Sequence, residues 1–258
     1  MDAVTTLLLA CAGLAGGIIT AVVGGSSLLI FPVMLAAGLP PILANTSSTV
    51  AMTPSSLAAA LADRERIPPW NRSFLGLLVV SVLGTVTGSL LLLFTPQAAF
   101  MAVVPLLVGA ATALFAFSDQ IKRAIARRTA GSANGARTHT MVQLSMVAVI
   151  AVYGGYFGAA MSVMLLAALA LGHEGDFRTI NTIKNILSAL VGAIAAAIFI
   201  SQGAVGWPQA LAVMVGALFG GYLGGKLVRV LPGGLLRWIV IVVGAGLAIY
   251  YAWRYWRV

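Results

Sequence analysis

Charge is what this sequence lacks most. Only 8% of its 258 residues are Asp, Glu, Lys or Arg, whereas 60% are hydrophobic. Soluble proteins carry about a quarter charged residues, so the chain is not an ordinary soluble domain. Its apolar runs are long and unbroken, which excludes the short alternating segments of a membrane β-barrel. The chain is therefore predicted to be an all-α, polytopic membrane protein.

Acidic residues and cysteine are scarce as well, with six Asp or Glu and one Cys. A single Cys excludes intrachain disulfides and a thiolate metal cluster, and Cys11 is expected to be a small packing residue in the first span. The acids fall at predicted segment ends or in loops: Asp2, Asp63, Glu65, Asp119, Glu174 and Asp176. No carboxylate is placed inside a span to carry a proton or bind sodium, which argues against a buried-carboxylate antiporter.

The sequence also lacks the signatures of an enzyme. It has no zinc-ligand set of His and Cys, no nucleophile elbow and no P-loop, so neither catalysis nor a cofactor is expected. The basic excess, 15 Lys and Arg for a net charge of +9, gathers in residues 63–72, 119–128 and 226–237. These clusters lie at the ends of apolar runs, where basic residues set membrane orientation. No soluble segment is long enough to form a nucleic-acid face, so the expected surroundings are lipid, and a homo-oligomer stays open.

A membrane span needs about 20 apolar residues. Full-length spans are predicted at 3–23, 73–94, 97–117, 141–161, 207–228 and 235–253. Two stretches differ, because a short run precedes a longer one: 26–37 before 46–62, and 159–171 before 180–200. Runs of about a dozen residues are too short to cross alone and favour broken or re-entrant helices.

The two halves share a pattern of polar, glycine and proline residues at nearly constant spacing. The matching positions are Gly24, Gly38, Asn45, Thr46, Trp70, Gly84, Gly88 and Pro96 with Gly158, Gly172, Asn181, Thr182, Trp207, Gly221, Gly225 and Pro232. We therefore predict a first membrane repeat at 1–118, a charged, Gly/Ser/Asn-rich flexible linker at 119–140 and a second repeat at 141–258. Three long spans plus one two-part segment per repeat favour an inverted repeat. The distribution of basic residues does not decide between this arrangement and four simple spans per half.

Two polar hexads stand out in this apolar chain: "ANTSST" at 44–49 and "INTIKN" at 180–185. Each is predicted to open a helix, where unpaired N–H groups and the positive end of the helix dipole favour an anion. If the two helix ends meet near the membrane midplane, they form an anion site. The candidate residues are Asn45, Thr46, Ser47, Ser48, Asn181, Lys184 and Asn185, with Arg178 nearby and Gly24 and Gly25 allowing close backbone approach.

An alternative interpretation stays open for every one of these residues. Ser and Thr in membrane helices often bond the carbonyl four residues earlier or hold helices together. Lys184 could extend its ammonium group to the membrane interface near Arg178. The glycines of "GTVTG" at 84–88, and Gly216, Gly220 and Gly224, are interpreted as helix-packing positions.

The segment "GLAGGIITAVVGGSSLLIFPVMLAAGLPPILANTSS" (13–48) and its counterpart "YGGYFGAAMSVMLLAALALGHEGDFRTINTIKNILSA" (153–189) resemble the sulfite exporter TauE/SafE family, also called TSUP permeases. The resemblance covers nearly the whole chain, although "GAA" at 158–160 stands where relatives often carry more glycine. It implies a multi-pass permease of the bacterial cytoplasmic membrane that moves sulfite, sulfoacetate or a related sulfonate. Export is expected; an anion channel, an uptake permease for an organic anion and a membrane scaffold remain alternatives.

Overall fold

The computed structural model describes residues 2–22, 26–62, 71–117, 120, 136–172, 177–227 and 233–256, and within them it contains helices and no strands. The helices are α1 (Ala3–Val22), α2 (Ser27–Ala36), α3 (Pro41–Ala62), α4 (Arg72–Phe94), α5 (Gln97–Ala116), α7 (Ala136–Tyr156), α8 (Met161–Gly172), α9 (Phe177–Ser201), α10 (Trp207–Leu227) and α11 (Gly233–Trp256). The all-α prediction is confirmed. The span expected at 141–161 instead ends at Tyr156, because the chain breaks around Gly158, where φ is +74°.

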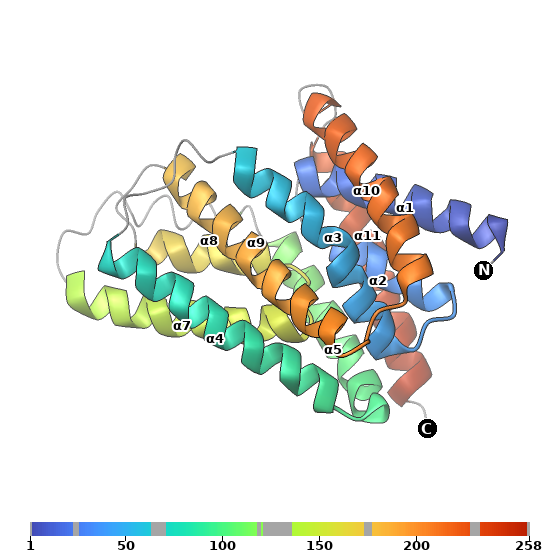
Figure 1. Ribbon diagram of the computed structural model, residues 1–258, viewed down its shortest axis with the longest axis horizontal. Helices are drawn as coiled ribbons and strands as arrows, with labels where there is room; N and C mark the ends of the chain where they lie inside the picture. The colour runs from blue at the N-terminus through green and yellow to red at the C-terminus, as the bar shows by residue number, and fades with distance from the viewer. Residues whose placement is uncertain are drawn as a thin grey trace.

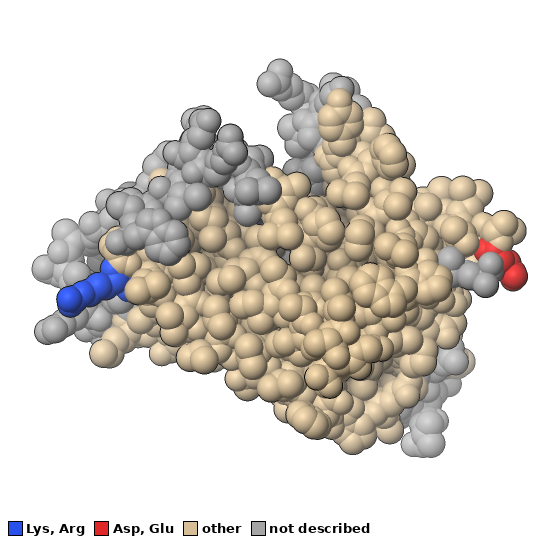
Figure 2. Space-filling model, viewed as in Figure 1, with Lys and Arg blue, Asp and Glu red and all other residues tan. Residues whose placement is uncertain are grey.

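Among the described residues, four helices are long and apolar enough to cross a membrane, over Ala3–Thr20, Arg72–Phe94, Gln97–Leu114 and Thr179–Ser201, and four shorter apolar stretches accompany them. Among the described residues on the face seen in Figure 2, the broad middle carries no Lys, Arg, Asp or Glu, with basic atoms visible at one end and acidic atoms at the other. Large apolar side chains such as Leu83, Phe94 and Phe219 are exposed, as expected of a surface that meets lipid. Cys11 is also exposed, so its expected packing role is wrong.

Helices α1 and α10 pack side by side through glycines on both (Figure 1). A Cβ on Gly13 would strike the backbone of Val213, and one on Gly17 would strike that of Ala217. Because both contacts advance in the same chain direction, the two helices run parallel. This packing allows the backbones to touch, as small residues do in membrane helix pairs.

Helices α4 and α7 form a second pair of the same kind. A Cβ on Gly84 would lie 2.8 Å from Ala151 Cβ, and one on Gly88 would lie 2.8 Å from the carbonyl carbon of Val152. In each pair one helix comes from the first half of the chain and the other from the second. The interpretation of these glycines as packing positions is confirmed for Gly84, Gly88, Gly216 and Gly220.

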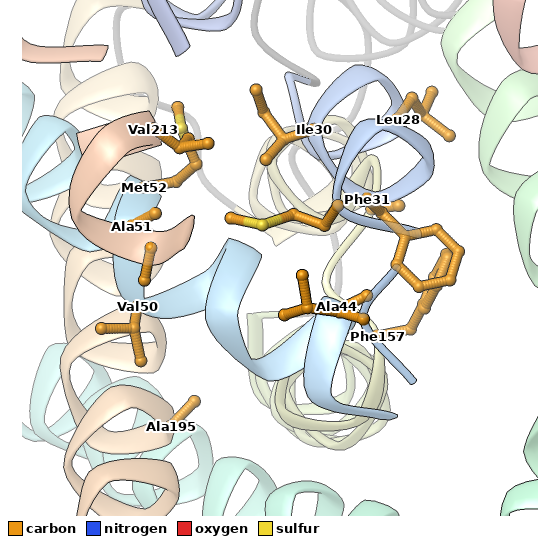
Figure 3. Packing of buried hydrophobic residues seen from close by; sticks show 14 of the residues in the cluster. Leu28, Ile30, Phe31, Ala44, Val50, Ala51, Met52, Phe157, Ala195 and Val213 are labelled. Carbon is orange, nitrogen blue, oxygen red and sulfur yellow. The ribbon is translucent and has the colours of Figure 1, made fainter. Parts of the chain in front are cut away.

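Helices α3 and α9 cross near the centre of the molecule and run in opposite directions (Figure 1). At the crossing, the Thr53 hydroxyl donates to the carbonyl of Gly192 at 3.2 Å. The start of α3 lies beside the end of α9, since Ala44 and Val50 share a buried core with Ala195. Figure 3 shows this core, with Phe31 of α2 and Phe157 beside each other next to Ala44.

The predicted short helices are present: α2 has 10 residues and α8 has 12. Helix α2 ends because Gly38 takes φ +87°, which turns the chain toward α3. Two backbone bonds close this turn, from Gly38 N–H to the Leu35 carbonyl at 3.0 Å and from Leu39 N–H to the Met34 carbonyl at 3.3 Å. The turn thereby places the first turns of α3 against the α9–α10 connection.

Replacing Gly38 by alanine should destabilise the protein by about 1 kcal/mol, because an L side chain rarely adopts its positive φ. An added Cβ would meet no atom within 4 Å, so the cost comes from backbone conformation alone. Thermal unfolding in detergent measures the effect. Gly246→Ala is the matched control, since that glycine is helical and also has open space around it. Equal melting temperatures for the two variants would contradict the role of Gly38 as a turn glycine.

Candidate functional site

The first hexad lies inside a helix and does not open one. Helix α3 begins at Pro41, one turn earlier than predicted, so Asn45 lies one turn inside the helix. A proline is tolerated in the first turn of a helix because the N–H that it lacks would have no helical partner there. Helix α9 begins at Phe177, which gives Asn181 the same position in its helix as Asn45 has in α3. The expectation that each hexad opens its helix is therefore wrong: in both halves the helix begins one turn before the hexad.

Asn45 joins the first hexad to the end of α7. Its side-chain amide donates to the backbone carbonyl of Tyr156 at 2.9 Å. Tyr156 is the last residue of α7, and the last carbonyls of a helix have no partner within the helix itself. In a membrane interior such a carbonyl must find a donor within the protein. Asn45, which is buried, supplies that donor.

Thr46 and Ser47 serve the end of α9 in the same way. The Thr46 hydroxyl donates to the carbonyl of Ala204 at 2.5 Å, and the N–H of Gly206 donates to the Ser47 hydroxyl oxygen at 2.8 Å. Ala204 and Gly206 belong to the turn between α9 and α10. Both hydroxyls are completely buried. The first hexad thus supplies side-chain partners to backbone groups at the end of α7 and in the turn between α9 and α10.

The remaining hydroxyls of the first hexad bond their own helix, α3. Ser48 donates to the Ala44 carbonyl at 2.6 Å, and Thr49 donates to the Asn45 carbonyl at 3.1 Å. This is the interpretation that the sequence left open for them, a bond to the carbonyl four residues earlier. The structure therefore gives the hydroxyls of the first hexad protein partners.

The second hexad has a different environment. Asn181, Lys184 and Asn185 are half-buried, whereas Thr182 is almost fully buried. Lys184 is set apart by its position. Of the side chains that the structure describes, the other charged ones are Asp2 and Arg72, and both are exposed. The side chain of Arg178, and Gly24 and Gly25, lie outside the described residues.

The two hexads do not converge. Asn45 precedes the crossing residue Thr53 by eight positions, and Lys184 precedes Gly192 by eight positions. Each therefore lies about 12 Å from the crossing at a rise of 1.5 Å per residue, and because the helices are antiparallel the two lie on opposite sides of it, about 24 Å apart along the helix axes. The expectation that both helix beginnings form a single pocket is therefore wrong, because the hexads lie on opposite sides of the crossing.

The break between α7 and α8, at the "GAA" stretch of residues 158–160, lies between the hexads. On one side Tyr156 accepts from Asn45; on the other, the Ser162 hydroxyl lies 3.4 Å from that of Ser188, one turn after Lys184. Ala160 takes a positive φ of 58° at this break, within the "GAA" stretch where relatives of the resembled family often carry more glycine. Hydrophobic periodicity cannot identify such a point, because Tyr and Ala count there as core residues.

Aromatic rings cover the break on the α2 and α5 side. Phe157 packs edge-to-face on Phe31 with ring centres 5.4 Å apart, and it lies 6.4 Å from both Phe100 and Tyr153. These contacts fix the orientation of the last turn of α7. In the part of the chain that the structure describes, no group of three His, Cys, Asp or Glu could hold a metal ion.

Comparisons with known proteins agree on a membrane transporter. The chain is 24% identical over 243 residues to a "Probable membrane transporter protein" of Haemophilus influenzae, covering 92% of this chain and 90% of that protein. It is 25% identical over 241 residues to the "Probable membrane transporter protein ORF9" of Sinorhizobium sp, covering 90% and 87%. No solved structure shows a significant match.

The family model described as "Sulfite exporter TauE/SafE" matches residues 9–251, which is nearly the whole chain. The helices that could span a membrane fit a transporter, and both relatives are named as membrane transporters, which are not enzymes. The resemblance noted in the sequence is thereby confirmed. This multi-pass membrane transporter belongs to the sulfite exporter TauE/SafE family.

Proposed function

We propose that this chain exports a small sulfur oxyanion, such as sulfite, sulfoacetate or another sulfonate, across the bacterial cytoplasmic membrane. The family description names sulfite export. The observation that carries the proposal is Lys184, a half-buried cation within a helix that is long and apolar enough to cross a membrane. A cation inside a membrane is costly to keep and marks substrate or ion pathways.

The neighbours of Lys184 on α9 suit an oxyanion. Asn181 lies three positions earlier and Asn185 is the next residue, so the three share one side of the helix. Amide N–H groups and an ammonium group are donors, and donors to a charged acceptor form the stronger hydrogen bonds. We include Arg178, three positions before Asn181. Gly24 and Gly25 would allow the backbone of the first half to approach the anion.

The first hexad has an indirect part in this proposal. Asn45, Thr46 and Ser47 hold the ends of α7 and α9, and Ser48 bonds within its own helix. We propose that these residues shape the pathway by fixing the backbone, while the second hexad binds the anion. The two hexads then have different roles although they occupy the same position in α3 and α9.

We further propose that residues 1–118 and 141–258 form an inverted repeat joined by the linker. The antiparallel crossing of α3 and α9 supports this, since these helices carry the matching hexads. The helix pairs support it too, because α1 with α10 in one pair corresponds to α7 with α4 in the other. Secondary transporters of other folds that contain inverted repeats bind their substrate at the interface between the repeats.

Export of an anion needs no coupling ion in this scheme. A cell interior that is negative drives an anion outward with about 2.3 kcal/mol per charge per 100 mV. The acids of the chain fall outside its described helices, so no described side chain within a helix offers a carboxylate for sodium or proton coupling. An absolute requirement for a sodium or proton gradient in transport assays would contradict uncoupled export.

The test is sulfite flux from proteoliposomes together with thermal stabilisation of the purified protein by sulfite, sulfate, thiosulfate, sulfoacetate and taurine. We expect saturable sulfite efflux, and Lys184→Ala should weaken sulfite binding about tenfold or more, because it removes a hydrogen bond to a charged group. Lys184→Arg should retain binding. Arg72→Ala is the control, since that cation is exposed at the start of α4 and should leave flux unchanged.

The alternatives give different results in the same assay. A channel would show flux that does not saturate and no counterflow exchange, and an uptake permease would move the anion inward against the expected direction. A scaffold would show no flux and no effect of Lys184→Ala. Any of these results would replace export as the function.

A further inference from the structure

Tyr153 has a buried hydroxyl for which the structure shows no hydrogen-bond partner. The residue lies in the last turn of α7, directly before the break that precedes α8. Buried polar atoms in folded proteins nearly always have a partner, and each exception calls for an explanation. In a membrane protein the cost of such a group is higher still, since no bulk water is near.

The position of Tyr153 connects this hydroxyl with the proposed pathway. The break after it lies between the two hexads, held by Asn45 through Tyr156 and adjoining α9 through Ser162 and Ser188. Tyr153 is fixed by an edge-to-face contact with Phe157, whose ring in turn packs on α2 and α5. The ring is therefore held in place while its hydroxyl remains without an acceptor.

We propose that the Tyr153 hydroxyl donates a hydrogen bond to the transported oxyanion as it passes the break between α7 and α8, an inference that rests on the proposed function. A phenol O–H donating to an oxyanion forms a short, strong bond. Lys184 lies one turn before Ser188, on the α9 side of the same break. Tyr153 thus binds the small oxyanion from α7, while Lys184 on α9 balances its negative charge.

Ser81 has the second buried hydroxyl for which the structure shows no partner, but it does not lie beside the break between α7 and α8. Its oxygen is also buried and without a partner, but it lies in the middle of α4, in an unbroken helix. Its own carbonyl accepts from the Thr85 hydroxyl at 2.6 Å, as in ordinary helix packing. Ser81 therefore provides a matched control, because its substitution also removes a buried hydroxyl.

The experiment compares Tyr153→Phe and Ser81→Ala with the wild-type chain, all purified in detergent. Both variants should fold with a melting temperature equal to or above that of wild type, since each loses an unsatisfied buried group. Sulfite affinity, measured by calorimetry, should fall about tenfold or more in Tyr153→Phe. It should stay at the wild-type value in Ser81→Ala. As a second measurement, sulfite should produce a tyrosine ultraviolet difference spectrum in wild type that is absent from Tyr153→Phe.

Each outcome decides a different question. Wild-type sulfite affinity in Tyr153→Phe, or a difference spectrum that persists in it, would overturn this inference and leave the proposed function intact. Should wild type bind none of the sulfur oxyanions, the proposed function would fail and the role of Tyr153 with it. A tenfold loss in both Tyr153→Phe and Ser81→Ala would also overturn the inference, because a general packing effect would then explain it.

Discussion

Replacing Gly220 by alanine should cost about 3 kcal/mol of stability, at the upper end for overpacking, because the added methyl group meets backbone and not a movable side chain. A Cβ on Gly220 would overlap the carbonyl oxygen of Leu14 in α1 and lie 2.8 Å from its carbonyl carbon. Backbone cannot rotate out of the way, so α1 and α10 must separate along their length. This separation would also break the other close contacts between the two helices, such as the contact of Gly13 with the backbone of Val213.

The control for this prediction is the next residue on the same helix. A Cβ on Gly221 would meet no atom within 4 Å, so Gly221→Ala should be neutral or slightly stabilising, since alanine favours helix more than glycine does. The two variants differ by one position and add the same methyl group. Unfolding in a denaturant series in detergent measures both. Equal stability of the two would show that α1 and α10 do not pack through this glycine.

Replacing Asn45 by alanine should destabilise the protein by about 2 kcal/mol, because it leaves the Tyr156 carbonyl without its donor. The carbonyl lies at the end of α7, where the helix itself offers no further partner. The break between α7 and α8 should then lose its fixed geometry, and sulfite flux in proteoliposomes should fall as well. Hydrogen exchange of the α7 and α8 amides would locate the loss.

Ser48→Ala is the matched control for Asn45→Ala. Ser48 is as buried as Asn45, but its hydroxyl bonds only within its own helix, to the Ala44 carbonyl. Its substitution should change stability by less than about 0.5 kcal/mol. If Asn45→Ala kept full stability and lost only sulfite binding, Asn45 would be a ligand of the anion and its structural role would be refuted.

The sequence predicted the helical architecture well because membrane spans are set by the length of apolar runs. The starts of α4, α5 and α10 were predicted to within one residue, and the short helices α2 and α8 were recognised as too short to cross alone. The start of α3 was missed by a turn, because a proline pair reads as a loop signal although the second proline begins the helix.

The candidate site could be predicted only in part. Repeat spacing identified Asn45 and Asn181 as equivalent positions, and the structure gives them the same place in α3 and α9. Spacing within one chain does not reveal how two helices cross, so the separation of the hexads could not be foreseen. Tyr153 was missed for a related reason: within an apolar run a tyrosine counts as a core residue, and only the fold shows that its hydroxyl has no partner.

The pairing of α1 with α10 has a consequence for how the protein is made. Gly13 packs against the backbone of Val213, so α1 finds this partner only after two hundred further residues have been synthesised. Until then, α1 must remain in the bilayer with its flat glycine surface against lipid or an insertion factor. A nascent chain truncated before α10 should therefore leave α1 open to membrane proteases, even though every residue of α1 is already present.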